Sequence, residues 1–396
     1  MASDQALGTA DTGRVSLFYN PVVRGIFFQI VVFFGLFAFI VWIVRNTLDN
    51  LASLGRTISF GFLNERAGFD VGQSLISYTS DSTYTDALIV GLLNTLLIAI
   101  VGIITATLVG FIIGIGRLSK NWLIRKLCTV YVEVFRNIPP LLVIFFWYLG
   151  VLAILPQPRD GFNLPFGTLL SNRGLTVPKP IWGEGAWLIG VALLLAIAMC
   201  FFVARRAKAR QMATGQRFPV LWTSVALLIG LPLLALIATG FPVTFSVPKL
   251  GAFQATGGAN ISPEFLALYL SLSLYTASFI AEIVRAGILG VSKGQTEAAY
   301  ALGLRPSVAT RLVIVPQAMR IIVPPLTSQY LNLTKNSSLA IAVGYADLVS
   351  IGGTILNKSG NSIQIVVIWM IVYLAISLAT SLFMNWFNAR VALVER

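Results

Sequence analysis

Eight long runs of apolar residues dominate this 396-residue sequence. A run of about 20 apolar residues is long enough to cross the hydrocarbon core of a membrane as an α-helix. Only 11% of the residues are charged, whereas soluble domains carry roughly 25%, so a soluble surface of this size would lack charge. The runs lie at approximately 26–44, 87–115, 128–152, 186–204, 220–241, 264–289, 317–334 and 363–388. The sequence therefore predicts an all-α integral membrane protein with about eight transmembrane helices.

The basic residues predict how these helices are oriented. Segments 117–126, 205–217 and 290–320 are rich in lysine and arginine, whereas segment 46–86 has more acidic than basic residues. Basic loops collect on the cytoplasmic side of a membrane. Alternate loops are basic, as eight crossings with both termini in the cytoplasm require. The net charge of +13 lies in short clusters beside apolar runs, which favours anionic lipid headgroups over nucleic acid as the partner.

Several kinds of chemistry have no residues to support them in this sequence. Histidine, the commonest general base and metal ligand, is absent. The two cysteines, Cys128 and Cys200, fall inside or beside apolar runs and are expected to be small buried side chains. A phosphate-binding P-loop needs Gly-Lys before Ser or Thr, and that dipeptide does not occur. We expect no catalytic residues, metal or cofactor in this chain, so any ATP must be bound by another polypeptide.

A short polar segment, "EAAYALGLRPSVATRLVIVP" (297–316), separates two apolar runs on the predicted cytoplasmic side. Gly303 can end a first short helix in the left-handed conformation, and Pro306 suits the first turn of a second. Pro316, without an amide donor, predicts a bend or boundary before the next crossing. One face of the second helix carries Val308, Leu312 and Val315. Two such helices would present a small surface to a cytosolic partner, although an amphipathic linker resting on headgroups has the same pattern.

This segment resembles the EAA loop in the membrane subunits of binding-protein-dependent ABC importers. The likeness consists of Glu-Ala-Ala, a glycine four residues after the second alanine, and an apolar-x-apolar-Pro ending. The matching positions are Glu297, Ala298, Ala299, Gly303, Val313, Val315 and Pro316. Valines stand where isoleucine and leucine are more usual in that family.

Flanking segments are similar to the polar amino-acid importers of the histidine-permease type. The similar segments are 131–150, 274–299, 315–326 and 335–340. The stretch 151–263, with two extra crossings, looks like an insertion found in the longer membrane subunits of general L-amino-acid importers. The resemblance covers roughly 87–388 and implies a type I ABC importer transmembrane domain over those residues. The remaining segments are then a cytoplasmic tail (1–25), a first helix with a periplasmic loop (26–86), and a C-terminal tail (389–396).

The resemblance also implies a function and a set of partners. The chain would be a permease subunit that carries L-amino acids across the bacterial cytoplasmic (inner) membrane. Two cytosolic ATPase subunits would bind ATP and Mg²⁺ and act on the chain through the loop 294–316. A periplasmic amino-acid-binding protein would deliver substrate, and a second, related permease subunit would complete the membrane part.

Two pairs of opposite charges lie within or beside the apolar runs. Glu133 and Arg136 can share a helix face at i, i+3, and Glu282 and Arg285 repeat that spacing. Charged groups in a membrane are expected to face protein or water. Each pair has two possible roles. It either lines or gates a translocation path, or its two charges neutralise each other and fix the packing of the helices. Asn137 and the prolines after it predict a broken helix whose free carbonyl groups can meet substrate.

A second polar region lies at 324–340. Pro324 and Pro325 predict a kink, and polar residues gather after it. Those residues are Asn332, Lys335, Asn336 and Ser337. Lys335 either meets a substrate carboxylate or anchors a loop.

Two other classes of membrane protein share some of these features. An ion-coupled secondary transporter would explain eight crossings and intramembrane acids, but it would not explain the EAA-type loop. An intramembrane enzyme would need a metal cluster or a nucleophile-base pair, and the sequence shows neither pattern.

Overall fold

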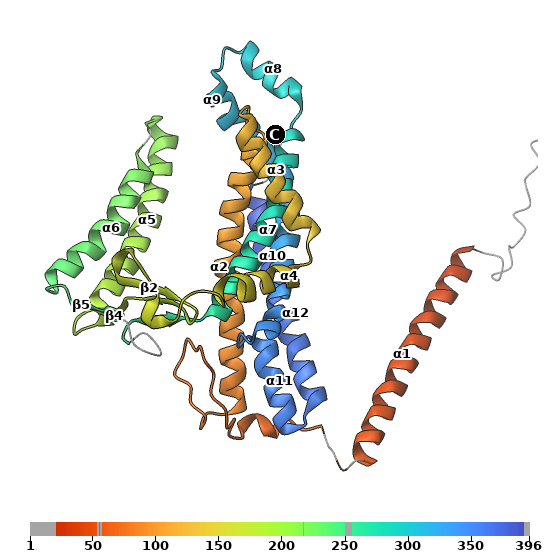
Figure 1. Ribbon diagram of the computed structural model, residues 1–396. Helices are drawn as coiled ribbons and strands as arrows, with labels where there is room; N and C mark the ends of the chain where they lie inside the picture. Colours follow the sequence, from red (N-terminus) through yellow and green to blue (C-terminus); the bar gives the residue numbers. More distant parts are fainter. Residues whose placement is uncertain (1–20, 54, 56–57, 217, 250–255, 392–396) are drawn as a thin grey trace, which may run out of the picture.

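The computed structural model describes residues 21–53, 55, 58–216, 218–249 and 256–391 (Figure 1). Its α-helices are α1 (Pro21–Ser53), α2 (Tyr84–Gly116), α3 (Trp122–Asn137), α4 (Pro140–Phe145), α5 (Trp187–Thr214), α6 (Val220–Ala238), α7 (Pro263–Leu289), α8 (Lys293–Ala301), α9 (Pro306–Ala309), α10 (Val315–Asn336), α11 (Leu348–Ser359) and α12 (Ser362–Val391). Shorter 3₁₀ turns are η1 (Gly61–Asn64), η3 (Pro158–Asp160), η4 (Pro165–Gly167) and η6 (Ser337–Val343), and two π-helical turns are η2 (Phe146–Leu152) and η5 (Thr310–Ile314). Residues 1–20 and 392–396 of the expected terminal tails lie outside the described residues.

The expected membrane helices are present. Within the described residues, seven helices are long and apolar enough to cross a membrane, and an eighth span arises if the bent pair α3 and α4–η2 is counted as one. That pair bends by 111° after Asn137, where two prolines follow. The eight apolar runs are confirmed by length and composition, and the third is a broken span.

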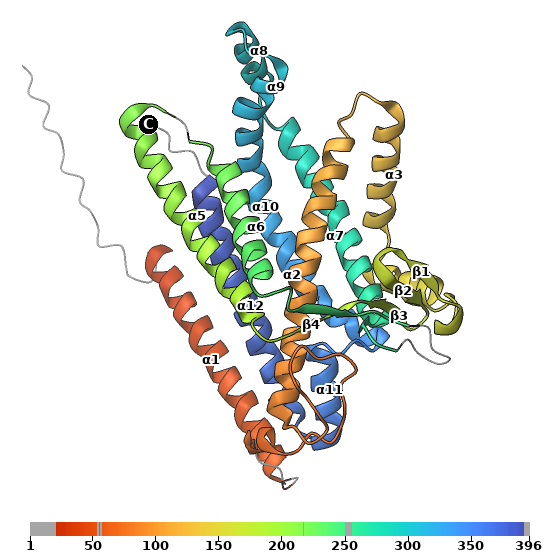
Figure 2. The same ribbon diagram turned by 90° about the vertical axis from the view of Figure 1, so that its left-hand side faces the viewer.

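Consecutive spans alternate in direction (Figures 1 and 2). The loop between α2 and α3, the turn between α5 and α6, and the pair α8–α9 all lie at one end of the bundle. Helix α1 runs away from that end and α12 runs toward it (Figure 2). The basic loops of the sequence therefore share one end of the molecule, as the charge pattern predicts.

A stripe of small residues brings α2 close to α7. Gly102, Ala106, Gly110 and Gly114 recur every fourth residue and are all buried. A Cβ atom built on Gly110 would lie 2.6 Å from Cγ2 of Ile280, inside van der Waals contact. Small residues at this spacing let membrane helices approach closely, where packing replaces the hydrophobic effect as the cohesive force. Helices α2, α7 and α10 therefore share the main core, which includes Ile280, Ile322 and Leu333.

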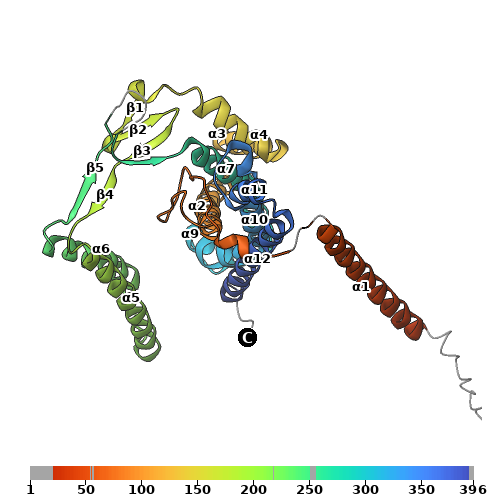
Figure 3. The same ribbon diagram turned by 90° about the horizontal axis from the view of Figure 1, so that it is seen from below.

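Short strands, which the sequence analysis did not predict, occupy the loops around the insertion. β1 (Phe162–Leu164), β2 (Thr168–Ser171), β3 (Gly174–Val177) and β6 (Ala259–Ile261) form an antiparallel sheet, and β4 (Lys179–Trp182) pairs with β5 (Val243–Ser246). Between β4 and β5 the chain forms the α5–α6 hairpin, which stands apart from the helix bundle (Figure 3). Strands of three or four residues broken by Gly and Pro carry too short a pattern to be recognised by alternation.

The end of the bundle opposite α8 and α9 is closed by α11. Asp347 caps this helix, accepting a hydrogen bond of 2.8 Å from the Ser350 amide. The Asp347 carboxylate is fully buried and also lies 3.4 Å from the Tyr373 hydroxyl of α12. Burial raises the pKa of Asp347 from 3.8 to about 6, because removal from water disfavours the charged form.

Candidate coupling segment and translocation path

The polar segment between α7 and α10 folds as two short helices that project from the bundle end (Figures 1 and 2). Helix α8 ends where Gly303 adopts a left-handed φ of +72°, a conformation that favours glycine. The Gly303 and Leu304 amides then donate to the carbonyl oxygens of Tyr300 and Ala299, which closes the turn. Helix α9 begins at Pro306. Both turn predictions are confirmed.

Pro316 lies at a boundary between two helical elements, which is one of the two outcomes that the sequence predicts. Residues 306–343 run as one continuous helical segment in which Pro316 lies at the start of α10. The π-helical turn η5 precedes it. A wider turn accommodates a proline that cannot donate the usual i→i−4 hydrogen bond. The short helix α9 is therefore joined to the transmembrane helix α10 without a flexible connection.

The outer surface of this pair carries exposed apolar side chains. Leu302 is 80% exposed and Leu312 is 64% exposed, and Tyr300 and Val308 are exposed nearby. Glu297 and Ala298 are exposed on α8, whereas Ala299 is buried inside the segment. Val313 and Pro316 are partly buried, and Val315 is exposed. Exposed apolar groups together on a small surface are typical of a protein contact.

A cluster of five charged side chains joins three helices just inside this end of the bundle. Glu282 on α7 pairs with Arg117, which caps the end of α2, and with Arg285 at 2.5 Å. Arg136 on α3 lies 4.0 Å from Glu282, and Glu133 lies 3.9 Å from Arg117. Arg117 is only 10% exposed. Charge-assisted hydrogen bonds from Arg117 and Arg285 to Glu282 join α2 to α7, and the longer ion pairs of Glu133 and Arg136 connect α3 to them.

The two pairs expected from sequence spacing have different outcomes. Glu282 and Arg285 do form an ion pair on one turn of α7. Glu133 pairs across helices with Arg117, and Arg136 lies 5.5 Å from the ring centroid of Phe279 as well as near Glu282. Their side chains therefore connect α3 to its neighbours. Arg117, which the sequence analysis did not single out, is the central cation, and only the tertiary packing brings it to Glu282.

The broken span begins where the sequence predicts it. The Asn137 side chain donates a hydrogen bond of 2.7 Å to the carbonyl oxygen of Glu133, which gives this carbonyl in the last turn of α3 a partner. Asn137, Ile138 and Pro139 are exposed within the chain. Exposed backbone at a helix break is tolerated in a membrane only beside protein or a wet cavity.

Helix α10 continues through Pro324 and Pro325, where the sequence predicts a kink. The helix ends at Asn336, the 3₁₀ turn η6 follows, and Gly344 adopts a left-handed φ of +78°. One face of α10 is exposed along its length. That face carries Ile321, Pro324, Pro325, Ser328, Asn332 and Lys335.

The polar residues at the end of α10 divide between this face and the core. Lys335 and Asn332 are exposed, and the Lys335 ammonium has no ion pair or hydrogen bond among the described residues. Asn336 is partly buried. Ser337 is fully buried, and its hydroxyl donates a hydrogen bond of 2.8 Å to the Thr334 carbonyl oxygen. Lys335 and Asn332 are therefore available to a ligand, whereas Ser337 makes a bond within its own turn.

This chain is similar in sequence to several known proteins. The chain is 64% identical over 381 residues to the general L-amino acid transport system permease protein AapQ of Rhizobium johnstonii, covering 96% of this chain and 95% of that protein. It is 50% identical over 383 residues to the putative amino-acid ABC transporter permease protein YhdX of Escherichia coli, covering 96% and 97% of the two chains. A crystal structure of an amino acid ABC transporter with histidines matches with a TM-score of 0.47 and 21% identity, covering 78% of this chain and 95% of that one.

The family model for the binding-protein-dependent transport system inner membrane component matches residues 106–393. That range begins within α2 and includes α8, α9 and every residue of the charge cluster. The match covers more than half of the chain. This multi-pass membrane protein belongs to the family of inner membrane components of binding-protein-dependent transport systems.

Proposed function

We propose that this chain is a permease subunit of an ATP-driven importer of L-amino acids in the bacterial cytoplasmic membrane. The observation that carries the proposal is the exposed pair α8–α9, which projects from the basic end of the bundle and is continuous with α10. The chain matches relatives that are named as amino-acid permeases, and each match covers almost the whole relative. This similarity supports L-amino acids as the substrate class. The basic end, with both termini, faces the cytoplasm.

The energy comes from partner subunits that bind ATP and Mg²⁺, since the sequence has no P-loop. Closure of two cytosolic ATPase subunits presses on the exposed apolar surface of α8 and α9. Because η5 links α9 to α10 without a break, the displacement reaches α10 as a tilt. Glu297, exposed and without an ion pair among the described residues, meets a basic group on the ATPase.

The exposed face of α10 requires a covering other than lipid. Lys335, Asn332 and Ser328 lie along it, and each would be costly against hydrocarbon. A second, related permease subunit covers this face and encloses a path between the two chains. Lys335 is then placed to meet the substrate carboxylate, and the break after Asn137 lies along the same path. A periplasmic binding protein delivers substrate from the opposite end.

Reconstitution tests this proposal against an ion-coupled transporter. The chain, co-purified with its partners from mild detergent, is placed in liposomes with ATP inside, and uptake of radiolabelled L-amino acids is measured. We expect uptake to require ATP, the ATPase chains and the binding protein, and to persist when ionophores dissipate every ion gradient. Uptake by the purified chain alone, or uptake that stops with the ion gradient, would show that the proposal is wrong.

A further inference from the structure

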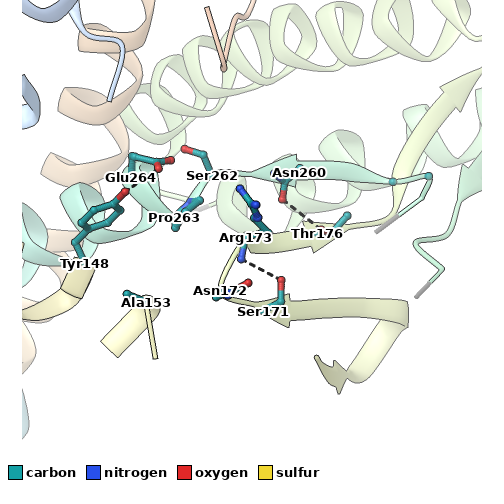
Figure 4. A pocket seen from close by; sticks show the side chains of 12 residues that line it. Tyr148, Ala153, Ser171, Asn172, Arg173, Thr176, Asn260, Ser262, Pro263 and Glu264 are labelled. Carbon is teal, nitrogen blue, oxygen red and sulfur yellow. Dashed lines mark hydrogen bonds between the residues drawn. The ribbon is translucent and has the colours of Figure 1, made fainter. Parts of the chain in front are cut away.

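A second feature lies away from the α10 face, at the first turn of α7. A cavity of about 840 Å³ opens where the sheet of the insertion meets α7 and the end of η2 (Figure 4). Its polar lining includes Tyr148, Asn172, Arg173, Asn260, Ser262 and Glu264. The sequence analysis assigned no role to these residues.

Two opposite charges line this cavity without neutralising each other. Arg173 projects from the turn between β2 and β3, and Glu264 lies in the first turn of α7 (Figure 4). No ion pair within 4.0 Å joins them among the described residues. Glu264 accepts a hydrogen bond of 3.1 Å from the Tyr148 hydroxyl, which orients its carboxylate. The Arg173 guanidinium has no hydrogen-bond or ion-pair partner within the described parts of the chain.

An unsatisfied acceptor lies beside these charges. The side-chain oxygen of Asn172 is buried and has no hydrogen-bond partner among the described residues, although Asn172 itself lines the cavity. A buried acceptor without a donor is costly, and buried polar groups normally have a partner. The cavity thus offers a cation and an anion to a ligand, and an unsatisfied acceptor lies within its wall.

We propose that this cavity binds a free L-amino acid as its zwitterion. Arg173 contacts the α-carboxylate with its planar fork of donors, a geometry suited to carboxylates. Glu264 accepts hydrogen bonds from the α-ammonium group. The site would recognise only the α-carboxylate and α-ammonium groups, and the rest of the 840 Å³ is left for the ligand's side chain. One site could therefore accept amino acids of many sizes. This inference rests on the proposed function, since it names a place where that substrate waits.

The position of the cavity suits a waiting site beside the path. Phe265, next to Glu264, has its ring centroid 5.8 Å from that of Tyr345. Tyr345 lies two residues after η6, which continues from the end of α10 that carries Lys335. Ser262, the cap of α7, also lies 3.4 Å from the Gln73 side-chain oxygen. A bound amino acid would therefore lie close to the outer end of the proposed translocation path.

Photolabelling of the full-length chain in lipid nanodiscs tests the site directly. The probe is photoleucine, an L-amino acid whose side chain carries a diazirine, and labelled peptides are identified by mass. We expect label on the peptides that contain residues 172–176 and 260–264, and competition by L-leucine. Isoamylamine, which lacks the carboxylate, and 4-methylpentanoate, which lacks the amine, should compete at least about tenfold less well, because each loses hydrogen bonds to a charged partner.

Variants give the second arm of the test. Arg173→Ala and Glu264→Gln should each raise the leucine concentration for half-competition about tenfold or more. Arg173→Lys, which keeps the charge and loses the fork, should give a smaller rise. Arg159→Ala and Glu184→Gln change exposed charges in the same insertion that do not line the cavity, and they should leave the labelling unchanged. Size-exclusion chromatography verifies that each variant remains folded.

The outcomes separate this inference from the proposed function. Label elsewhere, equal competition by isoamylamine, or unchanged competition in Arg173→Ala would overturn the zwitterion site, even if the reconstituted importer moves amino acids normally. Absence of ATP-dependent amino-acid uptake by the complete wild-type assembly would overturn the proposed function instead. Labelling that depends on both charges and on both side chains supports the site.

Discussion

Arg117 and Glu282 form an ion pair that joins the end of α2 to α7 near the basic end of the bundle. Glu282 is the only carboxylate within reach of Arg117, Arg136 and Arg285 together among the described residues. The three guanidinium groups would repel one another without it. This single acid therefore holds together the ends of three helices close to the coupling segment.

Neutralising Glu282 should destabilise the protein. In Glu282→Gln, three arginines lose the negative charge that they share, and we expect a loss of about 1–3 kcal/mol in the free energy of unfolding, reduced by solvent screening because the carboxylate is one-quarter exposed. Thermal unfolding in detergent measures the effect. Glu133→Gln is the matched control, since Glu133 is 58% exposed and 3.9 Å from Arg117, and it should change the melting temperature little. Equal effects of both variants would contradict the central role of Glu282.

The substitution Gly110→Ala, which adds one methyl group, should disturb the contact between α2 and α7. Its Cβ atom would lie 2.6 Å from the branched Ile280 side chain and 3.0 Å from the Ala277 carbonyl oxygen. Overpacking of this kind costs about 1–3 kcal/mol. Gly230→Ala, on α6 with no atom within 4 Å of the new Cβ, should be neutral or slightly stabilising. Melting temperatures of the two variants test the close approach.

Changes in the coupling segment should stop uptake while leaving membrane insertion intact. Gly303→Pro cannot adopt the φ of +72° that ends α8, and Glu297→Lys reverses the exposed charge offered to the ATPase. Both are measured as uptake by the reconstituted complex, with ATP hydrolysis followed in parallel. Gly25→Ala, on α1 outside this segment and with no atom within 4 Å of the new Cβ, is the control and should transport normally. Normal uptake by either coupling variant would refute the role of this segment.

Removing the Lys335 ammonium should weaken substrate recognition. Lys335→Ala takes away an unpaired cation on the exposed face of α10, so the KM for uptake should rise about tenfold or more if the group meets the substrate carboxylate. Lys179→Ala, on the exposed strand β4, should leave KM unchanged. An unaltered KM in Lys335→Ala would favour a loop-anchoring role for this lysine.

Stability should depend on pH through Asp347. Its pKa is raised by burial from 3.8 to about 6, so between these values the folded state retains a proton that the unfolded state has lost. Stability is therefore greatest below pH 4, falls as pH rises to about 6, and levels off there, a total loss of about 3 kcal/mol. Asp347→Asn retains a cap for α11 and should remove this dependence. Melting temperatures between pH 4 and 8 provide the measurement, and an unchanged slope in the variant would show that another group titrates.

The sequence predicted the features that depend on neighbouring residues. Apolar runs located the spans because lipid imposes a minimum length on them. Gly303 and Pro306 located the ends of two short helices because each residue restricts or frees its own backbone. The Glu282–Arg285 pair followed from one turn of helix.

Features that depend on tertiary packing were missed or misplaced. The pairing of Arg117 with Glu282 needs α2 and α7 to cross at that point, which no local pattern indicates. The sequence also did not show that α10 continues as helix beyond Pro324 and Pro325 to Asn336. The stripe of Gly102, Ala106, Gly110 and Gly114 was visible as a four-residue repeat, and it was the signal that could have predicted the α2–α7 contact.

The pairing of β3 with β6 places Val177 directly opposite Ala259. The α5–α6 hairpin lies between these two residues in the sequence, so the chain leaves the four-stranded sheet at β3 and returns to it at β6. Such a module can be excised by replacing residues 178–258 with a two-residue Asn-Gly turn, which suits antiparallel strands. A permease without the hairpin and one with it would differ by a single insertion between β3 and β6, outside the core helices α2, α7 and α10.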